Sequence, residues 1–303
     1  MDDLLKKHLS QFIIRYDKDG IIPYLKAEDF KGLNVKEKSF VNSKGIEIHY
    51  FYYNYENYNE TKVILFLPGL GPGHTAYLRE INKLCEHGYQ VLTLDYCGCG
   101  ASKGDNLISF YETTVDALDL LNMLELDKRI YVIGHSLGGF TALNILNHRR
   151  DINRGVLISP IITLKNQFKA FTGYTEDLTE VLEYESNNSS GYSSLANITY
   201  LTNTNDDILF IHSKDDPIVP FNSATGYIKE NCKNKSLRFM CVENKYHNPN
   251  YTLEAVKLYN ELNNKYLSLN NKEDKIKLMK DVDPFVLTEQ DEIIWESIFN
   301  FIK

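Results

Sequence analysis

A serine lies between two glycines in the segment Gly134, His135, Ser136, Leu137, Gly138. A serine hydroxyl attacks an acyl carbonyl when a neighbouring base removes its proton. A Gly-x-Ser-x-Gly segment between a strand and a helix holds its serine on a sharp, strained turn above the edge of the sheet. The two glycines are needed because side chains at those positions would collide. The segment therefore predicts a nucleophile at Ser136.

The sequence on both sides of Ser136 supplies the strand and the helix that such a turn requires. Residues 130–133 are apolar, β-branched or aromatic and end at a glycine, and residues 137–147 follow a helical pattern. A helix that begins at Leu137 would direct its N-terminal dipole and free N–H groups at the site. This arrangement would favour the negative charge that develops during acyl transfer.

The Gly-His-Ser-Leu-Gly-Gly segment after an apolar strand resembles the α/β-hydrolase superfamily. It is most similar to the branch that holds esterases, monoacylglycerol lipase-like enzymes and serine aminopeptidase-like proteins. The resemblance covers roughly residues 40–250 and the final helix. It implies the α/β-hydrolase fold, a Ser-His-Asp triad and no cofactor, and it is specific for the superfamily rather than for any one substrate.

The catalytic base should follow the nucleophile and the acid, because the chain order in this superfamily is serine, acid, histidine. His247 follows the last predicted strand, on a loop that reaches the same sheet edge as Ser136, and it is the expected base. His148 is a weaker candidate. His212 lies inside a predicted strand and precedes the acid candidates.

The catalytic acid should follow the strand before that one. The segment that ends at Val219 and Pro220 resembles the superfamily pattern Gly-x-x-Asp-x-x-Val-Pro, which places the acid at Asp216. Asp215 stays open as an alternative, because Ser213 stands where glycine is usual and could shift the turn.

Two backbone N–H groups should form the oxyanion hole, which stabilises the charge on the carbonyl oxygen. The resemblance implies that Leu137, just after the nucleophile, supplies one of them. Residues 67–74 resemble the superfamily's His-Gly-x-Gly loop, with Pro68 in place of its histidine, and imply Leu70 as the second donor. His74 is expected to be structural or to face the substrate.

Residues 95–102 resemble the superfamily's structural Asp-x-Arg-Gly-x-Gly-x-Ser turn, with Cys97 and Cys99 in place of its arginine and histidine. The chain has five cysteines, an odd number that favours free thiols over a disulfide framework. Cys97 and Cys99 lack a second ligand pair at matching spacing, so no metal site is expected. His135 is expected to be structural.

The elements that must position these residues alternate along the chain. Strand-like segments cover 46–53, 63–67, 90–94, 130–133, 155–158, 208–211 and 237–242. Helical patterns cover 77–86, 110–126, 137–147 and 224–231. Alternating strands and helices predict βαβ units, and short continuous apolar strands predict a doubly wound, mostly parallel sheet covered on both faces.

Two regions interrupt this alternation within what we expect to be a single domain, 1–303. Residues 161–207 contain several aromatic residues and no clear strand, which predicts a small cap insertion. Residues 252–303 are expected to form C-terminal helices, near 252–267 and 289–302, and the last of these should pack on the sheet.

Composition narrows the class of protein. The 303 residues are 43% hydrophobic and 24% charged, as in an ordinary globular protein. The net charge is −8 and no basic stripe is present, so a nucleic-acid partner is not expected. The sequence contains no apolar run of about 20 residues and no secretory signal pattern. We therefore expect a cytoplasmic protein without an integral membrane segment, whose oligomeric state the sequence leaves open.

These observations predict a carboxylic ester hydrolase that acts on a small-molecule ester through an acyl-enzyme. The aromatic residues of 161–207 suggest a partly apolar pocket, suited to a short or medium acyl group or an aromatic acid. A peptidase, a thioesterase or an acyltransferase with the same triad stays open, as does a non-catalytic binding protein on this scaffold.

Overall fold

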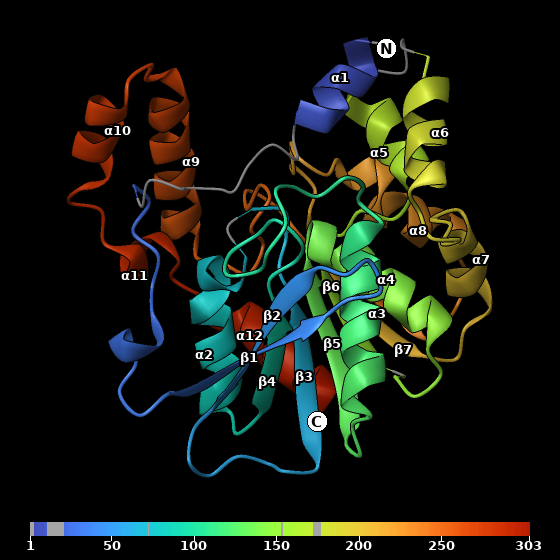
Figure 1. Cartoon of the computed structure of the whole chain (residues 1–303), viewed down its shortest axis with the longest axis horizontal. Coiled ribbons are helices and arrows are strands. Elements are labelled where there is room, and N and C mark those ends of the chain that lie inside the picture. Colours follow the sequence, from blue (N-terminus) through green and yellow to red (C-terminus); the bar gives the residue numbers. More distant parts are fainter. Residues whose placement is uncertain (1–2, 11–20, 72, 153, 172–176) are drawn as a thin grey trace.

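An eight-stranded sheet forms the centre of the chain in this computed structural model, which describes residues 3–10, 21–71, 73–152, 154–171 and 177–303 (Figure 1). The strand order is β1-β2-β4-β3-β5-β6-β7-β8. The pairs β1–β2 and β2–β4 are antiparallel, and all later neighbours are parallel. The predicted mostly parallel sheet is confirmed. The strands are Asn34–Val41 (β1), Glu47–Asn54 (β2), Lys62–Leu67 (β3), Gln90–Leu94 (β4), Arg129–His135 (β5), Arg154–Ile158 (β6), Asp207–Ser213 (β7) and Leu237–Val242 (β8).

Helices cover both faces of this sheet. The described α-helices are Asp3–Ser10 (α1), Leu78–Glu86 (α2), Glu112–Leu124 (α3), Leu137–His148 (α4), Leu164–Phe171 (α5), Thr179–Asn187 (α6), Ala196–Asn203 (α7), Thr225–Asn231 (α8), Leu253–Ser268 (α9), Lys272–Met279 (α10), Pro284–Leu287 (α11) and Glu292–Ile302 (α12). Short 3-10 helices occupy Ala27–Asp29 (η1), His74–Tyr77 (η2) and Phe221–Ser223 (η3). One apolar core lies between the sheet and α3 and α4, and a second lies between the sheet and α2 and α12.

Strand β5 shows how the sequence serves both cores. Its side chains alternate between faces, as in any strand. Ile130 and Val132 belong to the core under α3 and α4, whereas Tyr131 and Ile133 belong to the core under α2 and α12. Every second residue must therefore be apolar on each face, which explains the continuous apolar run before Gly134.

The edge strand β1 was not predicted from the sequence. It pairs with β2 from Asn34↔Asn54 to Val41↔Glu47, and most of its side chains are exposed. Lys36, Glu37 and Lys38 interrupt its apolar pattern. Charged side chains are typical of edge strands, because they discourage pairing with another sheet.

The range 161–207, predicted to be a cap, holds α5, α6 and α7 within its described residues. Residues 172–176, and with them Tyr174, lie outside the described part of the chain. Helix α1 packs against α6 through a buried pair, in which His8 Nε2 lies 2.5 Å from Glu185 Oε1. Ser109 Oγ donates to the other oxygen of Glu185 at 2.7 Å. These contacts fasten α6 to the chain segment that precedes α3.

The C-terminal range 252–303 holds four helices in place of the two predicted from its sequence. Helix α12 packs against the sheet and buries Trp295 completely. Helices α9 and α10 lie at the left of Figure 1 and expose most of their side chains. In the described ranges, none of the helices combines the length and apolar character needed to cross a bilayer.

Candidate active site

Ser136 lies on a sharp turn between β5 and α4. Its φ of 57° and ψ of −118° are rare for a residue with a side chain. A Cβ at Gly134 would lie 2.1 Å from the Gly138 carbonyl oxygen, and one at Gly138 would lie 2.0 Å from the Leu67 oxygen. The two glycines thus allow the chain to reverse so tightly, and the Ser136 side chain remains partly exposed.

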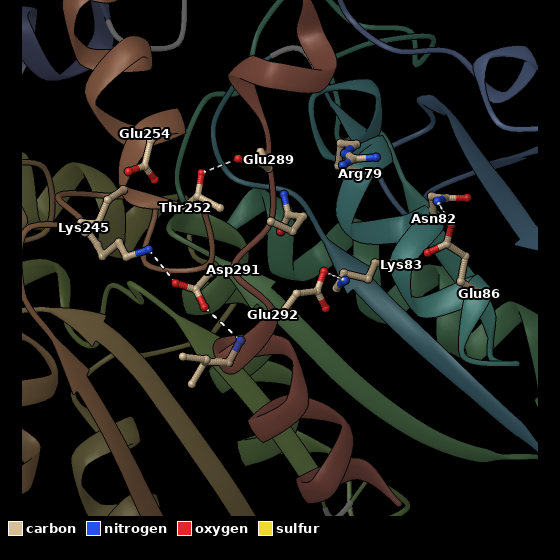
Figure 2. A pocket seen from close by; sticks show the side chains of 13 residues that line it. Arg79, Asn82, Lys83, Glu86, Lys245, Thr252, Glu254, Glu289, Asp291 and Glu292 are labelled. Atoms are coloured by element: carbon tan, nitrogen blue, oxygen red, sulfur yellow. Dashed lines mark hydrogen bonds and ion pairs between the residues drawn. The ribbon is translucent and has the colours of Figure 1, made fainter.

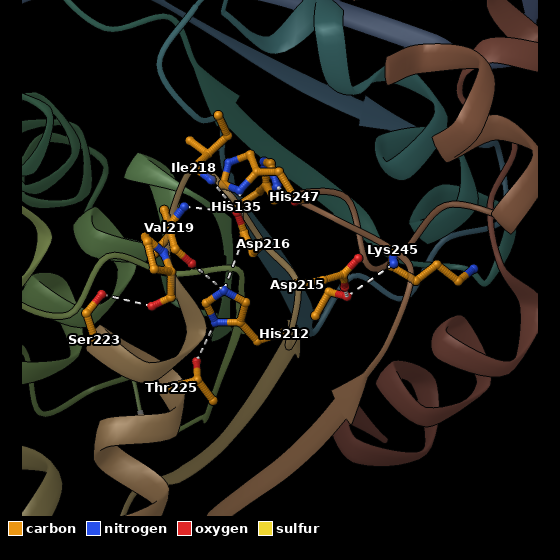
Figure 3. A network of polar contacts seen from close by, with 12 residues as sticks. His135, His212, Asp215, Asp216, Ile218, Val219, Ser223, Thr225, Lys245 and His247 are labelled. Atoms are coloured by element: carbon orange, nitrogen blue, oxygen red, sulfur yellow. Dashed lines mark hydrogen bonds and ion pairs between the residues drawn. The ribbon is translucent and has the colours of Figure 1, made fainter. Parts of the chain in front are cut away.

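His247 and Asp216 are brought together at the same edge of the sheet. His247 Nδ1 lies 2.8 Å from Asp216 Oδ2, across the two loops that follow β8 and β7 (Figure 3). The alternative acid, Asp215, has an exposed side chain that accepts a hydrogen bond from Ser213 Oγ. The serine at position 213 therefore turns Asp215 toward itself, and the buried Asp216 side chain faces the histidine.

Asp216 is surrounded by hydrogen-bond donors. Its Oδ1 accepts the backbone N–H groups of Ile218 at 2.8 Å and Val219 at 2.9 Å. Its Oδ2 accepts from His247 and from His212 Nε2, which lies 3.1 Å away. Burial opposes ionisation of Asp216, but the hydrogen bonds from His212 and His247 outweigh it and hold the pKa of this carboxyl well below its ordinary value.

His135 precedes Ser136 in the chain and connects the turn of Ser136 to the loop of His247. His135 Nε2 lies 2.8 Å from the His247 carbonyl oxygen, and the two rings are 4.7 Å apart between centroids. In the described part of the chain the Ser136 hydroxyl has no hydrogen-bond partner, so the bond between nucleophile and base is open in this structure. Hydrogen bonds of this kind are often long without substrate and shorten in the complex.

The two predicted oxyanion donors lack acceptors. Among the described residues, nothing accepts a hydrogen bond from the backbone N–H of Leu70 or of Leu137. The loop that carries Leu70 packs against the nucleophile, since a Cβ at Gly69 would lie 3.3 Å from Ser136 Cβ. Backbone N–H groups that lack an acceptor and lie next to a nucleophile are what an oxyanion requires. Pro72 of this loop lies outside the described residues.

His74 and His148, two other histidines considered in the sequence, contact residues outside the proposed triad. His74 is buried and its Nδ1 lies 2.9 Å from Asp95 Oδ1. His148 packs edge-on against Tyr192, with ring centroids 4.6 Å apart.

The turn after β4 is closed by hydrogen bonds despite its two cysteines. Asp95 Oδ2 accepts the N–H of Ala101 at 2.9 Å, and the backbone N–H of Cys97 donates to Asp116 Oδ2 at 2.8 Å. Cys97 and Cys99 are both buried, and neither forms a disulfide bond. Within the described ranges, no three His, Cys, Asp or Glu side chains come together as metal ligands.

A pocket of about 650 Å³ lies between α2 and the N-terminal ends of α9 and α12, and it is not the predicted reaction site (Figure 2). Its two lysines pair with acidic side chains: Lys83 with Glu292 at 2.6 Å, and Lys245 with Asp291 at 2.8 Å. None of its lining residues is Ser136, Asp216 or His247. Lys245 nevertheless belongs to the loop that carries His247.

Two residues that sequence reasoning left out belong to this site. His212 was placed inside a strand, which is correct, but its ring reaches the carboxylate of Asp216. Tyr77 was placed at the start of a helix, and its hydroxyl lies 2.9 Å from His135 Nδ1. The contact of Tyr77 has no local signal in the sequence, because its partner lies 58 residues away. His212 lies only four residues before Asp216, but its position inside a strand did not indicate that its ring reaches the carboxylate.

Comparison with known protein families finds that the chain is similar to hydrolases. A family model described as "Serine aminopeptidase, S33" matches residues 58–189, somewhat less than half of the chain. The lysophosphatidylserine lipase ABHD12 of Danio rerio is 30% identical over 194 residues, which cover 58% of this chain and 48% of that protein. A proline iminopeptidase of Saccharolobus solfataricus is 31% identical over 136 residues, covering 43% of this chain and 42% of the relative. The chain spans about half the length of the curated relatives it matches.

Solved structures share the fold at low sequence identity. The esterase Pf2001 of Pyrococcus furiosus aligns with a TM-score of 0.58 at 18% identity, over 80% of this chain and 94% of that one. Est1E of Butyrivibrio proteoclasticus, solved with ferulic acid bound, aligns with a TM-score of 0.58 at 18% identity, over 77% of this chain and 100% of that one. These similarities confirm the predicted fold class.

Proposed function

We propose that this chain, which has the α/β-hydrolase fold, is a serine hydrolase of that superfamily and cleaves a carboxylic ester through an acyl-enzyme. Ser136 is the nucleophile, His247 the base and Asp216 the acid. The N–H groups of Leu70 and Leu137 hold the oxyanion. The observation that carries this proposal is the 2.8 Å contact between His247 Nδ1 and Asp216 Oδ2, next to a serine on a strained turn.

The reaction follows from the proton positions. Asp216 carries a negative charge and accepts a hydrogen bond from the Nδ1–H of His247, which leaves Nε2 free to take the proton of the Ser136 hydroxyl. Ser136 Oγ then bonds to the carbonyl carbon, and the carbonyl oxygen becomes an anion held by Leu70 and Leu137. His247 returns its proton to the leaving alcohol, and then activates the water that hydrolyses the acyl-enzyme. Apart from the attacking water, every group that acts on the substrate in these steps is a residue of the protein.

The substrate class is an ester with a partly apolar acyl group. The apolar and aromatic side chains of 161–207 that are buried in the core, such as Phe168, Leu178 and Val181, support an apolar acyl portion. Lysophosphatidylserine lipases are among the relatives at about 30% identity, so single-chain phospholipid esters belong among the substrates to test.

A peptidase is the second candidate, favoured by the match to the serine aminopeptidase model and by the proline iminopeptidase relative. It would use the same serine, histidine and oxyanion donors on an amide. An aminopeptidase must also bind a substrate's terminal ammonium group. A prolyl p-nitroanilide substrate separates this candidate from an esterase.

The test is a panel of p-nitrophenyl esters from acetate to palmitate, together with a lysophospholipid and prolyl p-nitroanilide, on the wild type and on Ser136→Ala. We expect turnover of one ester class and a fall of at least ~10⁴-fold in kcat in the variant. A fluorophosphonate probe should label the wild type and not Ser136→Ala.

Three outcomes would count against the proposal in different ways. Hydrolysis of the anilide without any ester turnover would replace the esterase with a peptidase. Ester turnover that survives in Ser136→Ala would remove the nucleophile. Absence of both turnover and labelling in the wild type would favour a non-catalytic binding protein on this scaffold.

A further inference from the structure

Tyr77 ends the short helix η2, which directly follows the predicted oxyanion loop, and its hydroxyl touches two catalytic segments. The backbone N–H of Gly69 donates to Tyr77 Oη at 3.0 Å. The same oxygen lies 2.9 Å from His135 Nδ1, next to the nucleophile. One hydroxyl group thus bridges the loop that carries Leu70 and the turn that carries Ser136.

The hydrogens of this bridge have one consistent arrangement. His135 Nε2 lies 2.8 Å from the His247 carbonyl oxygen, which only accepts, so Nε2 carries the proton. Burial, reinforced by the neighbouring His247, lowers the pKa of His135 to about 3, so the ring is neutral and Nδ1 is an acceptor. The Tyr77 O–H therefore donates to Nδ1, and its oxygen accepts the Gly69 N–H.

The resulting chain of hydrogen bonds passes through all three parts of the proposed site. It runs from the Gly69 N–H to Tyr77, from Tyr77 to His135, and from His135 to the carbonyl of His247. The Gly69 N–H already donates to Tyr77. The next backbone N–H in the sequence is that of Leu70, which has no acceptor among the described residues.

The approach of Tyr77 to this loop is close. A Cβ at Gly69 would lie 2.6 Å from Tyr77 Oη and 3.3 Å from the His135 carbonyl oxygen. Residue 69 must therefore be glycine for the bridge to form, and the hydroxyl group fixes the direction of the Pro68–Gly69 peptide, the one before the peptide that carries the Leu70 N–H.

We propose that Tyr77 is a positioning residue that, through His135, aligns the Leu70 N–H with Ser136 and with the loop of His247. This inference rests on the proposed function, because it assigns a role in the oxyanion hole of that reaction. Tyr77 touches neither the substrate nor the reacting atoms. It acts by holding a donor in the position where the oxyanion forms.

The test removes the hydroxyl group with Tyr77→Phe and measures steady-state kinetics on the best ester. We expect kcat to fall ~10- to 100-fold, less than the loss of a whole oxyanion donor, while KM changes less than about threefold. Affinity for a trifluoromethyl ketone, whose hemiketal oxygen occupies the oxyanion hole, should fall in parallel with kcat/KM. Tyr55→Phe is the matched control, because it removes a 2.7 Å hydrogen bond to Asn82 of α2 away from Ser136.

Two substitutions at His135 separate its hydrogen bond to Tyr77 from its hydrogen bond to His247. His135→Asn keeps an acceptor near the Nδ1 position and loses the donor to His247, whereas His135→Gln keeps a donor toward His247 and loses the acceptor. Tyr77→Phe should therefore cost as much in the His135→Asn background as in the wild type. In the His135→Gln background it should cost clearly less, since the bridge is already broken.

The outcomes distinguish this inference from the proposed function. If wild type hydrolyses esters and Tyr77→Phe keeps its kcat and its ketone affinity, the positioning role is overturned and the triad stands. A fall in kcat that Tyr55→Phe matches would also overturn it, because the effect would then be one of stability. A wild type without Ser136-dependent turnover would instead reject the proposed function.

Discussion

The loop between β8 and α9 contacts two buried carboxyl groups whose ionisation tendencies are opposite. At one end His247 meets Asp216, and at the other end Asn250 Nδ2 donates to Glu80 Oε1 at 3.0 Å. Both carboxyl groups are almost completely buried. Their pKa values nevertheless move in opposite directions, so burial alone does not decide the charge of an acid in this protein.

The kind of hydrogen-bond donor explains the difference. Asp216 accepts two backbone N–H groups and two imidazole nitrogens. Glu80 Oε1 accepts from the uncharged amide of Asn250 at 3.0 Å, and Tyr251 and Gln290 are further uncharged donors to this carboxyl. Burial raises the pKa of Glu80 to about 7, and these uncharged donors offset only part of that effect. The reaction needs an anion beside His247, and the chain supplies it with converging donors rather than with solvent.

The largest expected effect comes from neutralising Asp216. Asp216→Asn should lower kcat ~10³- to 10⁴-fold, because the amide cannot stabilise the imidazolium form of His247. Asp215→Asn, one residue away and exposed, should change kcat less than about twofold. Ester hydrolysis at pH 8 is the measurement. A large loss in Asp215→Asn with little in Asp216→Asn would reverse the assignment of the acid and remove the contrast with Glu80.

A smaller effect, on stability, is expected from Glu80→Gln. A carboxyl whose pKa is raised in the folded state favours folding below its unfolded pKa of about 4.5, and that contribution is lost as pH rises through about 7. By pH 8 an ionised Glu80 should cost about 3 kcal/mol relative to pH 4.5. Glu80→Gln removes this cost, so its unfolding free energy should gain on the wild type as pH rises from 5 to 8.

Urea denaturation at pH 5 and pH 8 measures this difference. Glu86→Gln is the matched control, because Glu86 is an exposed carboxyl on the same helix. It should follow the wild type at both pH values. If the difference between Glu80→Gln and wild type does not change with pH, Glu80 is not the buried neutral acid of this comparison.

Local sequence patterns predict much of the region around Asp216 and His247, and little of the region around Glu80. The strands and the turn of Ser136 follow from short segments, because each depends on neighbours within a few residues. The order of acid and base and the preference for Asp216 over Asp215 come from the resemblance to the superfamily. The structure adds that Asp216 contacts His247, whereas Asp215 accepts a hydrogen bond from Ser213. The edge strand β1 was missed because its charged residues hide the strand pattern.

The remaining contacts could not be predicted, because they join residues that are far apart in the sequence. Tyr77 and His135 are 58 residues apart, and Glu80 and Asn250 are 170 apart. A tyrosine in a helix or a glutamate on its apolar face has no local feature that names its partner. Their roles follow only from the way parallel strands bring their loops to one edge of the sheet.

The smallest effect in this series is expected at His212, which tests whether the donor count at Asp216 matters. Its Nε2 lies 2.9 Å from the Val219 carbonyl oxygen and 3.1 Å from Asp216 Oδ2, so one N–H is shared between two acceptors. The Val219 carbonyl only accepts, so Nε2 carries the proton, and Nδ1 accepts the O–H of Thr225 at 2.8 Å. His212→Leu removes the shared donor and leaves Asp216 with three.

A carboxylate with fewer donors should attract the proton on the His247 ring more strongly. We therefore expect the acid limb of the kcat/KM profile of His212→Leu to move to higher pH by less than about one unit, with kcat/KM at pH 8 reduced ~3- to 10-fold. Thr225→Val keeps the His212 ring and should move that limb less. A limb that stays in place, or moves to lower pH, would mean that the remaining donors alone hold Asp216 ionised. The contrast with Glu80 would then rest on the backbone N–H groups of Ile218 and Val219 and on His247.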